Sequence, residues 1–137
     1  LYEGWASLEM RQGNNEVARK LISKALTLNK RGGSGWRMAA HIEREFGNDG
    51  LASLLLRRGI ECAPDDGELY RELGSVLFNQ GKVNDARHVL EQGIEVNPLY
   101  APLYHTLAEL EAQVFNIEGL SKLNKRTVEI FNTNTTD

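Results

Sequence analysis

The segment ELYRELGSVLFNQGKVNDARHVLEQGIEVNP, residues 68–98, decides the fold. From Tyr70, apolar and small residues follow at helical spacing up to Gly81, a residue that can take a positive φ, end one helix and let the next begin. A second helical stretch then runs to Pro98, which lacks an N–H and stops it. The segment therefore predicts two antiparallel helices joined by a tight turn.

The same pattern recurs at a constant interval of 34 residues. The large aromatic recurs as Tyr2, Trp36, Tyr70 and Tyr104. Small residues, turn glycines and prolines keep the same register: Ala6, Ala40, Gly74 and Ala108; Gly13, Gly47 and Gly81; Ala18, Ala52 and Ala86; Pro64 and Pro98. Phe115 breaks the glycine column. This period is typical of stacked helix hairpins, each of which needs its neighbours to bury its apolar face.

We therefore predict an all-α protein, an α-solenoid of four helix-turn-helix repeats with eight antiparallel helices, no strand and no second domain. The repeats cover about 1–32, 33–66, 67–100 and 101–131, followed by a frayed polar tail at 132–137. The expected helices are 1–11, 15–28, 35–46, 49–62, 67–79, 83–96, 101–114 and 117–131. Residues 30–35, KRGGSG, are expected to form a loop between repeats.

Composition bounds the class of protein. The 137 residues are 41% hydrophobic and 26% charged, as in a soluble globular domain, and the formal net charge of −3 argues against a strongly basic nucleic-acid surface. Cys62 is the only cysteine, which excludes an internal disulfide and suits an intracellular, reducing compartment. No apolar run approaches the roughly 20 residues that span a membrane. Because the sequence lacks an initial Met and starts inside a periodic segment, we expect a fragment of a longer repeat protein, with further repeats upstream.

The sequence gives little support for a catalytic site or a metal site. The three histidines, His41, His88 and His105, are scattered, and no second cysteine supports Cys62, so we expect no metal and no cofactor. No nucleophile, base and orienting group can be assembled, so we predict neither an enzyme nor a small-molecule substrate.

A column of glutamates, Glu9, Glu43 and Glu111, could suggest acid-base chemistry. Its recurrence at the repeat interval instead indicates that each carboxylate has the same structural role in its own repeat, in which it interacts with an arginine or a helix N-terminus. Arg19 is expected to meet Glu9 across its hairpin, whereas Arg87 is expected to face Leu77.

The repeats resemble a known family. Repeat three is similar to a tetratricopeptide repeat (TPR) in its residues Tyr70, Leu73, Gly74, Leu77, Gly81, Ala86, Leu90, Gly93 and Pro98. Repeat one resembles the half-a-TPR (HAT) variant, whose pattern is aromatics, a Glu, Gly-Asn and Ala-Arg, in Tyr2, Trp5, Glu9, Gly13-Asn14 and Ala18-Arg19. Repeat two replaces the arginine by Ser53, and repeat four loses both the Gly and the Ala-Arg. The resemblance implies a HAT/TPR superhelix in an RNA-processing complex (pre-mRNA or rRNA maturation), in the nucleus or alternatively in a chloroplast or mitochondrion.

The resemblance also implies where ligands bind, because the first helices of TPR arrays line a concave groove. The candidate binding residues on that face are Arg37, His41, Arg44, Arg71, Phe78 and His105, which predict a mildly basic middle with an apolar contact at Phe78. Chaperone-binding TPR domains clamp a terminal carboxylate with Lys, Asn and Arg on these helices. The matching positions here hold Glu3, Gly4, Ser7, Met38, Glu68 and Glu72. Starting from repeat two, they hold Arg37, His41, Glu72, Pro102 and Thr106, and neither register builds that clamp.

The main functional hypothesis is a protein-interaction scaffold whose groove takes a partner helix or an extended peptide. One alternative is direct binding of single-stranded RNA by arginines and aromatics of the groove. The other is homodimerisation through the atypical last repeat, which carries Phe115, Asn124 and Phe131.

Overall fold

The computed structural model describes residues 2–135, and over this range the chain forms eight α-helices and no strand. Their bounds are α1 Tyr2–Arg11, α2 Asn15–Leu28, α3 Gly33–Glu45, α4 Asp49–Cys62, α5 Gly67–Asn79, α6 Val83–Val96, α7 Ala101–Gln113 and α8 Ile117–Thr135. The all-α prediction is confirmed, and the predicted bounds of α2, α4, α5 and α6 match the structure. None of these helices is both long and apolar enough to cross a membrane.

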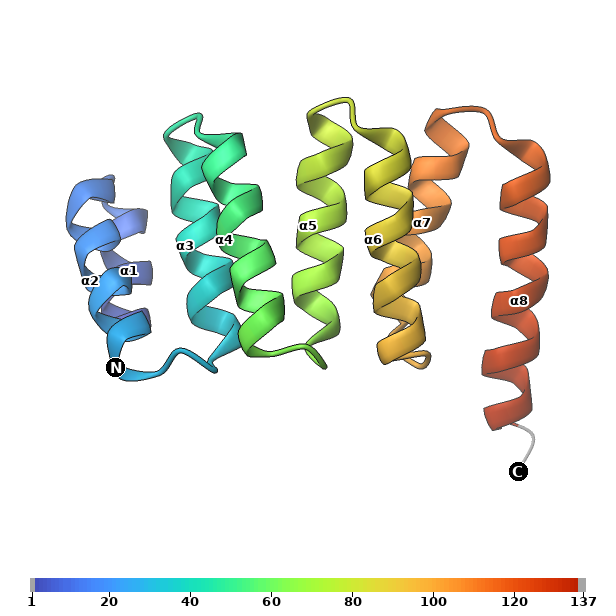
Figure 1. Ribbon diagram of the computed structural model, residues 1–137, viewed down its shortest axis with the longest axis horizontal. Helices are drawn as coiled ribbons and strands as arrows, with labels where there is room; N and C mark the ends of the chain where they lie inside the picture. The colour runs from blue at the N-terminus through green and yellow to red at the C-terminus, as the bar shows by residue number, and fades with distance from the viewer. Residues whose placement is uncertain (1, 136–137) are drawn as a thin grey trace.

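The helices form a single row of antiparallel hairpins, with α1 and α2 at one end and α8 at the other (Figure 1). Within the row, α2 packs on α3, α4 on α5 and α6 on α7. The first helices of the hairpins, α1, α3, α5 and α7, also approach one another, whereas no such approach joins the second helices α2, α4, α6 and α8 in the described part of the chain. The row therefore curves with its first helices on the inner side.

Three of the four recurring aromatics bond their first helix to the loop before it. Trp36 Nε1 donates a hydrogen bond to the carbonyl of Lys30 at 2.7 Å, six residues earlier. Tyr70 and Tyr104 repeat this bond to the carbonyls of Pro64 and Pro98, at 2.8 and 2.6 Å. All three rings are buried, as large amphipathic side chains are when their polar tip finds a partner. These residues therefore hold the repeats together.

Close packing beside these rings depends on glycine. A Cβ added to Gly59 would lie 2.7 Å from the Cβ of Trp36, and one added to Gly93 would lie 2.7 Å from the Cβ of Tyr70. No side chain fits at that distance, because real Cβ atoms do not approach so closely. The two helices of the second and third hairpins therefore meet at a position where only glycine fits.

The four hairpin turns have the same backbone. Gly13, Gly47 and Gly81 take φ values of 82°, 80° and 80°, as predicted, and Phe115 takes 58° in the same column. The next N–H in each turn donates to the carbonyl five residues earlier: Asn14 to Glu9, Asn48 to Glu43, Lys82 to Leu77 and Asn116 to Glu111. This bond closes the end of a helix, so the turn geometry holds even where phenylalanine replaces glycine.

Four predicted boundaries were wrong. Residues 33–35, predicted as loop, form the start of α3, where a Cβ on Gly33 would collide with the carboxylate of Asp66, so these glycines serve close packing. Helix α8 continues to Thr135, so residues 132–135 extend a helix that was expected to end at 131. Helices α3 and α7 each end one residue earlier than predicted. Leu1, expected to be helical, and residues 136–137, expected in the tail, lie outside the described residues.

Two of the three junctions between repeats carry the same set of polar side chains. Arg19 on α2 donates from Nε and Nη2 to the two carboxylate oxygens of Glu43 on α3, at 2.8 and 2.9 Å, and Asn48 donates to the same carboxylate at 3.0 Å. Arg87 on α6 reaches Glu111 on α7 at 3.0 and 2.6 Å, and Asn116 joins it at 2.8 Å. In both sets the arginine precedes its glutamate by 24 residues.

The structural role predicted for Glu43 and Glu111 is confirmed, but the predicted partners were wrong. Arg19 was expected to meet Glu9 within its hairpin, and it bonds instead to the next repeat. Arg87 was expected to face Leu77, and it too reaches forward. The middle junction lacks the set altogether, because Ser53 and Leu77 occupy its two positions and both are buried.

Candidate binding groove

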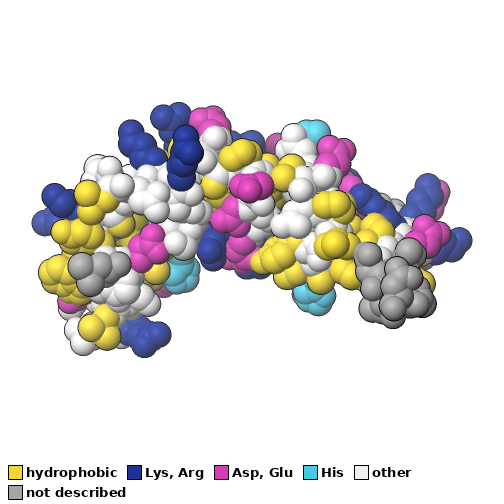
Figure 2. Space-filling model, turned by 90° about the horizontal axis from the view of Figure 1, so that it is seen from below, with side chains coloured by type: hydrophobic (Ala, Val, Ile, Leu, Met, Phe, Trp, Pro, Cys, Tyr) yellow, Lys and Arg dark blue, Asp and Glu magenta, His cyan; other side chains and the backbone are white. Residues whose placement is uncertain are grey.

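Viewed along the helices, the molecule is an arch that is hollowed along one long edge (Figure 2). The inner side of the arch carries two separate hollows. The first, of about 690 Å³, lies between α1 and α3 and extends to α5. The second, of about 260 Å³, lies between α5 and α7. Both are lined mainly by first helices, so the repeat geometry places them where the sequence predicted a groove.

The first hollow has an adaptable apolar surface. Met10 on α1 and Met38 on α3 both line it, and they are the only two methionines of the chain. Ser7 and Ser34 line the same hollow. Because a methionine side chain is unbranched and polarizable, a pair of them fits apolar groups of differing shape. The hollow is therefore suited to an apolar side chain of a ligand.

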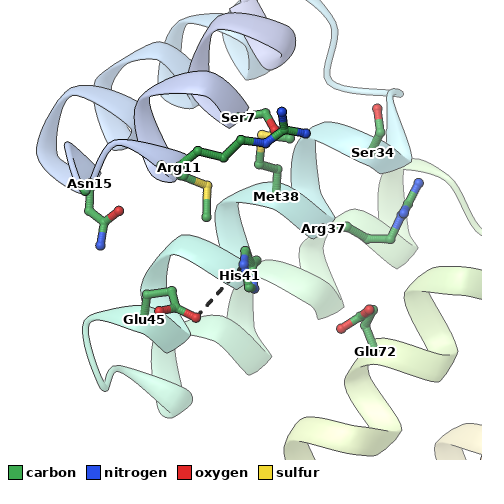
Figure 3. Close-up of a pocket in the computed structure, with 11 residues that line it drawn as sticks. Ser7, Arg11, Asn15, Ser34, Arg37, Met38, His41, Glu45 and Glu72 are labelled. Carbon is green, nitrogen blue, oxygen red and sulfur yellow. Dashed lines mark ion pairs between the residues drawn. The ribbon is translucent and has the colours of Figure 1, made fainter.

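Two arginines in the first hollow, Arg11 and Arg37, lie at ion-pair distance from no carboxylate within residues 2–135, although the charge of Arg37 also acts on Glu68. Arg11 extends across the hollow towards Ser7 and Met38 (Figure 3). Arg37 lines the same hollow, and its Nε is buried without a hydrogen-bond partner in the described part of the chain. A buried N–H that is not bonded costs free energy, so a movement of Arg37 that brings this group to a carbonyl or carboxylate oxygen of a ligand recovers that cost. The nearby His41 is directed towards Glu45, with Nε2 4.0 Å from the carboxylate.

A cluster of ion pairs separates the two hollows. Arg71 on α5 donates to Glu68 at 2.8 Å from Nε and to Glu72 at 2.7 Å from Nη2. Arg44 on α3 lies 3.7 Å from the carboxylate of Glu72. The Tyr100 hydroxyl also donates to Glu68. Glutamates of α5 thus neutralise the charges of Arg44 and Arg71.

The electrostatics of this cluster favour charged Glu68. Burial raises the pKa of Glu68, but the hydrogen bonds from Arg71 and Tyr100 and the charges of Arg71 and Arg37 outweigh it, so the pKa lies below its ordinary value. The same hydrogen bond from Tyr100 to Glu68 raises the pKa of the tyrosine. A paired and hydrogen-bonded carboxylate of this kind holds α5 against the loop before α7 and is poorly placed to bind a cation.

The structure distributes the six predicted binding residues over three places. Arg37 and His41 line the first hollow, and Phe78 lines the second. Arg44 and Arg71 belong to the ion-pair cluster between the hollows. His105 lies 2.9 Å from Glu109, which borders the second hollow. The predicted basic middle is therefore wrong, because its two arginines are neutralised by neighbouring glutamates.

Sequence reasoning missed Arg11, Glu45 and Glu72 as neighbours in the first hollow. Only Glu45 had a recognisable sequence pattern, because it follows His41 by four residues, one helical turn. Arg11 and Glu72 carry no comparable pattern, because their meeting depends on how α1, α3 and α5 stack. In the described part of the chain no group of His, Cys, Asp and Glu could hold a metal ion.

No protein-family model matches the sequence. A TPR-containing protein of Dictyostelium discoideum is 25% identical over 104 residues, which cover 76% of this chain and 8% of that relative. The first TPR domain of Spaghetti (RPAP3), solved bound to an HSP90 peptide, has a TM-score of 0.69 at 13% identity and covers 82% of this chain and 90% of that one. The chain has the fold of a tetratricopeptide-type repeat array.

Two further solved structures share the fold of this repeat array. MamA has a TM-score of 0.77 at 16% identity, over 99% of this chain and 80% of that chain. An O-GlcNAc transferase mutant of Thermobaculum terrenum has a TM-score of 0.66 at 24% identity, over 80% of this chain and 21% of that chain. The TPR-type array spans only 8% of the length of the curated relative that it matches.

The likeness to Spaghetti (RPAP3) concerns the fold of the array. At the positions matched to a carboxylate clamp, Glu3 accepts a hydrogen bond from Ser34 at 2.7 Å and Glu72 is paired with Arg44 and Arg71. A carboxylate has no hydrogen to donate to a terminal carboxylate, so these two positions lack the donors that such a clamp needs.

Proposed function

We propose that this chain is a non-catalytic scaffold that binds another protein, as a helix or an extended peptide, along the inner side of the arch. The observation that carries the proposal is the first hollow, which Met10 and Met38 line together with Arg11 and Arg37. An apolar surface with a few convergent polar groups is the usual form of a binding site.

The hollow selects for a particular ligand chemistry. An apolar side chain rests on the two methionines, while a carbonyl or carboxylate oxygen accepts from Arg37 or Arg11. Glu72 is paired with Arg44 and Arg71. It does not lie at ion-pair distance from Arg37 or Arg11, so it does not compete with a ligand for them. A peptide with an apolar residue next to an acidic one fits this arrangement.

Protein is favoured over RNA as the ligand because three of the four recurring aromatics are not available for stacking. Trp36, Tyr70 and Tyr104 are buried, and each donates to a backbone carbonyl. Single-stranded RNA binding depends on exposed rings beside unpaired cations. Here the middle arginines, Arg44 and Arg71, are also paired within the protein.

We further propose that the scaffold acts in RNA processing in the nucleus. This proposal rests on the resemblance to HAT repeats. One feature of the structure supports that resemblance. The Glu, Asn and Arg of the HAT pattern form the polar sets at two junctions, through Glu43 with Arg19 and Glu111 with Arg87.

A pull-down with matched variants tests the scaffold proposal. The parent chain is compared with Arg11→Glu/Arg37→Glu, which reverses the two available charges of the hollow. The control is Arg57→Glu, which makes the same change on the exposed surface of α4. We expect a bound protein, identified by mass spectrometry, to be retained by the parent and the control and lost from the double variant.

Nuclease treatment and a salt titration distinguish a protein ligand from an RNA ligand. Binding that survives nuclease supports a protein ligand, whereas binding that is lost with nuclease and falls steeply with salt assigns the groove to RNA. Equal retention by the double variant and by Arg57→Glu would exclude the first hollow as the binding site.

A further inference from the structure

The outer face of α1, opposite to α3, exposes apolar residues that every other first helix buries. Trp5 and Leu8 are each 51% exposed. The residues in the same two columns of α3, α5 and α7 are all buried against the preceding second helix: Ala39 and Ile42, Leu73 and Val76, Leu107 and Leu110. The face of Trp5, Leu8 and Glu9, here called the α1 face, is therefore built like the receiving side of a repeat junction.

The α1 face also carries the acceptor half of the polar junction set. Asn14 Nδ2 donates to Glu9 Oε2 at 2.8 Å, as Asn48 does to Glu43 and Asn116 to Glu111. Trp5 Nε1 donates to the other oxygen, Oε1, at 3.2 Å. What Glu9 lacks within residues 2–135 is the arginine that Glu43 and Glu111 receive from the helix before them. The carboxylate is thus already oriented for a guanidinium.

A second copy of this chain does not supply the missing half. Stacked head to tail, it would present α8, where Ser121 stands in the column of Arg19 and Arg87. Asn124 stands in the column of Ile22, Leu56 and Leu90, and both polar residues of α8 are exposed. Such a contact would set polar groups against Trp5 and Leu8 and would not present to Glu9 the arginine that Glu43 and Glu111 receive.

We propose that the α1 face is an interaction surface for a further helix hairpin of this repeat type, whose second helix presents an arginine to Glu9. Joined ahead of Leu1, such a hairpin places that arginine 24 residues before Glu9, as at the two observed junctions. This surface lies at the end of the array and is distinct from the groove, so it provides a second, specific point of assembly.

The chain contains a hairpin with which to test the proposal. Residues 67–102 are fused directly ahead of Leu1, which places the added copy of Arg87 24 residues before Glu9. The added segment contains no tryptophan, and Trp36 is buried, so quenching of tryptophan fluorescence by acrylamide reports mainly on Trp5. We expect Trp5 to lose its exposure to quencher in the fused chain, with emission shifted to shorter wavelength and a higher urea midpoint.

Substitutions in the fused chain test the arginine itself. Arg87→Ala in the added copy alone is expected to lower the urea midpoint and to restore part of the quenching of Trp5 by acrylamide. The control is the same substitution at the original Arg87, which lowers the midpoint but leaves Trp5 protected. Combining Arg87→Ser in the added copy with Glu9→Leu recreates the Ser53 and Leu77 junction and should protect Trp5 again.

Three results would overturn the proposal. Trp5 could remain as open to acrylamide in the fused chain as in the 137-residue chain, whether or not circular dichroism shows the added helices. Arg87→Ala in the added copy could leave both quenching and midpoint unchanged. Protection of Trp5 in the unfused chain at high concentration, with a dimer in sedimentation, would assign the α1 face to a second copy.

Discussion

At the scale of single residues, Phe115 is the one described non-glycine residue with a positive φ, 58°, and its side chain is 85% exposed. The bond from Asn116 to the carbonyl of Glu111 closes the turn and holds Phe115 in this conformation. A left-handed conformation costs a residue with a Cβ about 1–2 kcal/mol. Glycine avoids that cost, although it adds about 0.4–1 kcal/mol of entropy to the unfolded chain.

We therefore predict that Phe115→Gly raises the free energy of unfolding by about 0.5–1 kcal/mol in urea denaturation. The matched control is Gly81→Ala, at the same column of repeat three. An added Cβ there meets nothing within 4 Å, so its cost comes from the backbone alone. Gly81→Ala should lower stability by about 1 kcal/mol. If Phe115→Gly lowered stability instead, the phenylalanine would have to make a stabilising contact in spite of its exposure.

At the scale of elements, the junctions between hairpins show two solutions to the same packing problem. The junction of α6 with α7 uses Arg87 and Glu111, whose carboxylate is nearly buried, whereas the junction of α4 with α5 uses Ser53 and Leu77. Removing one member of a buried charged pair leaves the other without a partner, whereas replacing both by an apolar solution need not destabilise.

We predict that Arg87→Ser alone lowers the free energy of unfolding by about 1.5–3 kcal/mol. The double variant Arg87→Ser/Glu111→Leu, which copies the middle junction, should recover most of that loss. The measurement is a double-mutant cycle from urea denaturation of the parent, the two single variants and the double variant. Additive losses in the double variant would show that the two junctions are not interchangeable.

The elements themselves were largely predictable, because the aromatic, glycine and proline columns act between residues that are close in the sequence. Tyr70 bonds to Pro64 and Gly81 closes its own turn, so a local pattern is enough to find them. The start of α3 was missed because the glycine-rich sequence suggests a loop, whereas contact with the following loop, at Asp66, favours the helix.

Contacts between hairpins were much less predictable. The pairing of Arg19 with Glu43 instead of Glu9 depends on how far α2 lies from α3, which no local pattern encodes. The neutralisation of Arg44 by Glu72 across α3 and α5 has the same origin. The sequence therefore located the inner face of the array but misjudged its charge, and the interval of 24 residues between Arg and Glu becomes a usable signal only once the stacking is known.

At the scale of the whole molecule, the buried side chains form two clusters of unequal size. The larger extends from Trp36 to Leu123, and the smaller joins Ala6, Ala18, Leu21, Ile22, Ala39 and Ile42. The first hairpin therefore depends on its junction with α3, where Arg19 and Glu43 are the polar link. Because an array of stacked repeats is stabilised by nearest-neighbour interfaces, conditions that weaken this junction release the first hairpin first.

Acid weakens that junction through Glu43. Burial raises the pKa of Glu43, but hydrogen bonds from Arg19 and Asn48 and the charge of Arg19 outweigh it, so the pKa lies below the ordinary value of 4.5. A carboxylate with a lowered pKa stabilises the folded state above its unfolded pKa, and this contribution is lost as the pH falls through the folded value. We predict that Glu43→Gln lowers the urea midpoint at pH 7, and that its difference from the parent shrinks progressively as the pH is lowered from about 4.5.

Urea midpoints of both chains at pH 7, 5 and 3 measure this difference. Glu95→Gln, which changes an exposed carboxylate on α6, serves as the control and should shift the midpoint little at pH 7. A difference between Glu43→Gln and the parent that stays constant from pH 7 to pH 3 would mean that the charge of Glu43 does not stabilise the junction, and that its hydrogen bonds act equally well when the carboxyl is neutral. Convergence of the two chains at low pH would instead place the first acid-sensitive step of unfolding at the interface between α2 and α3.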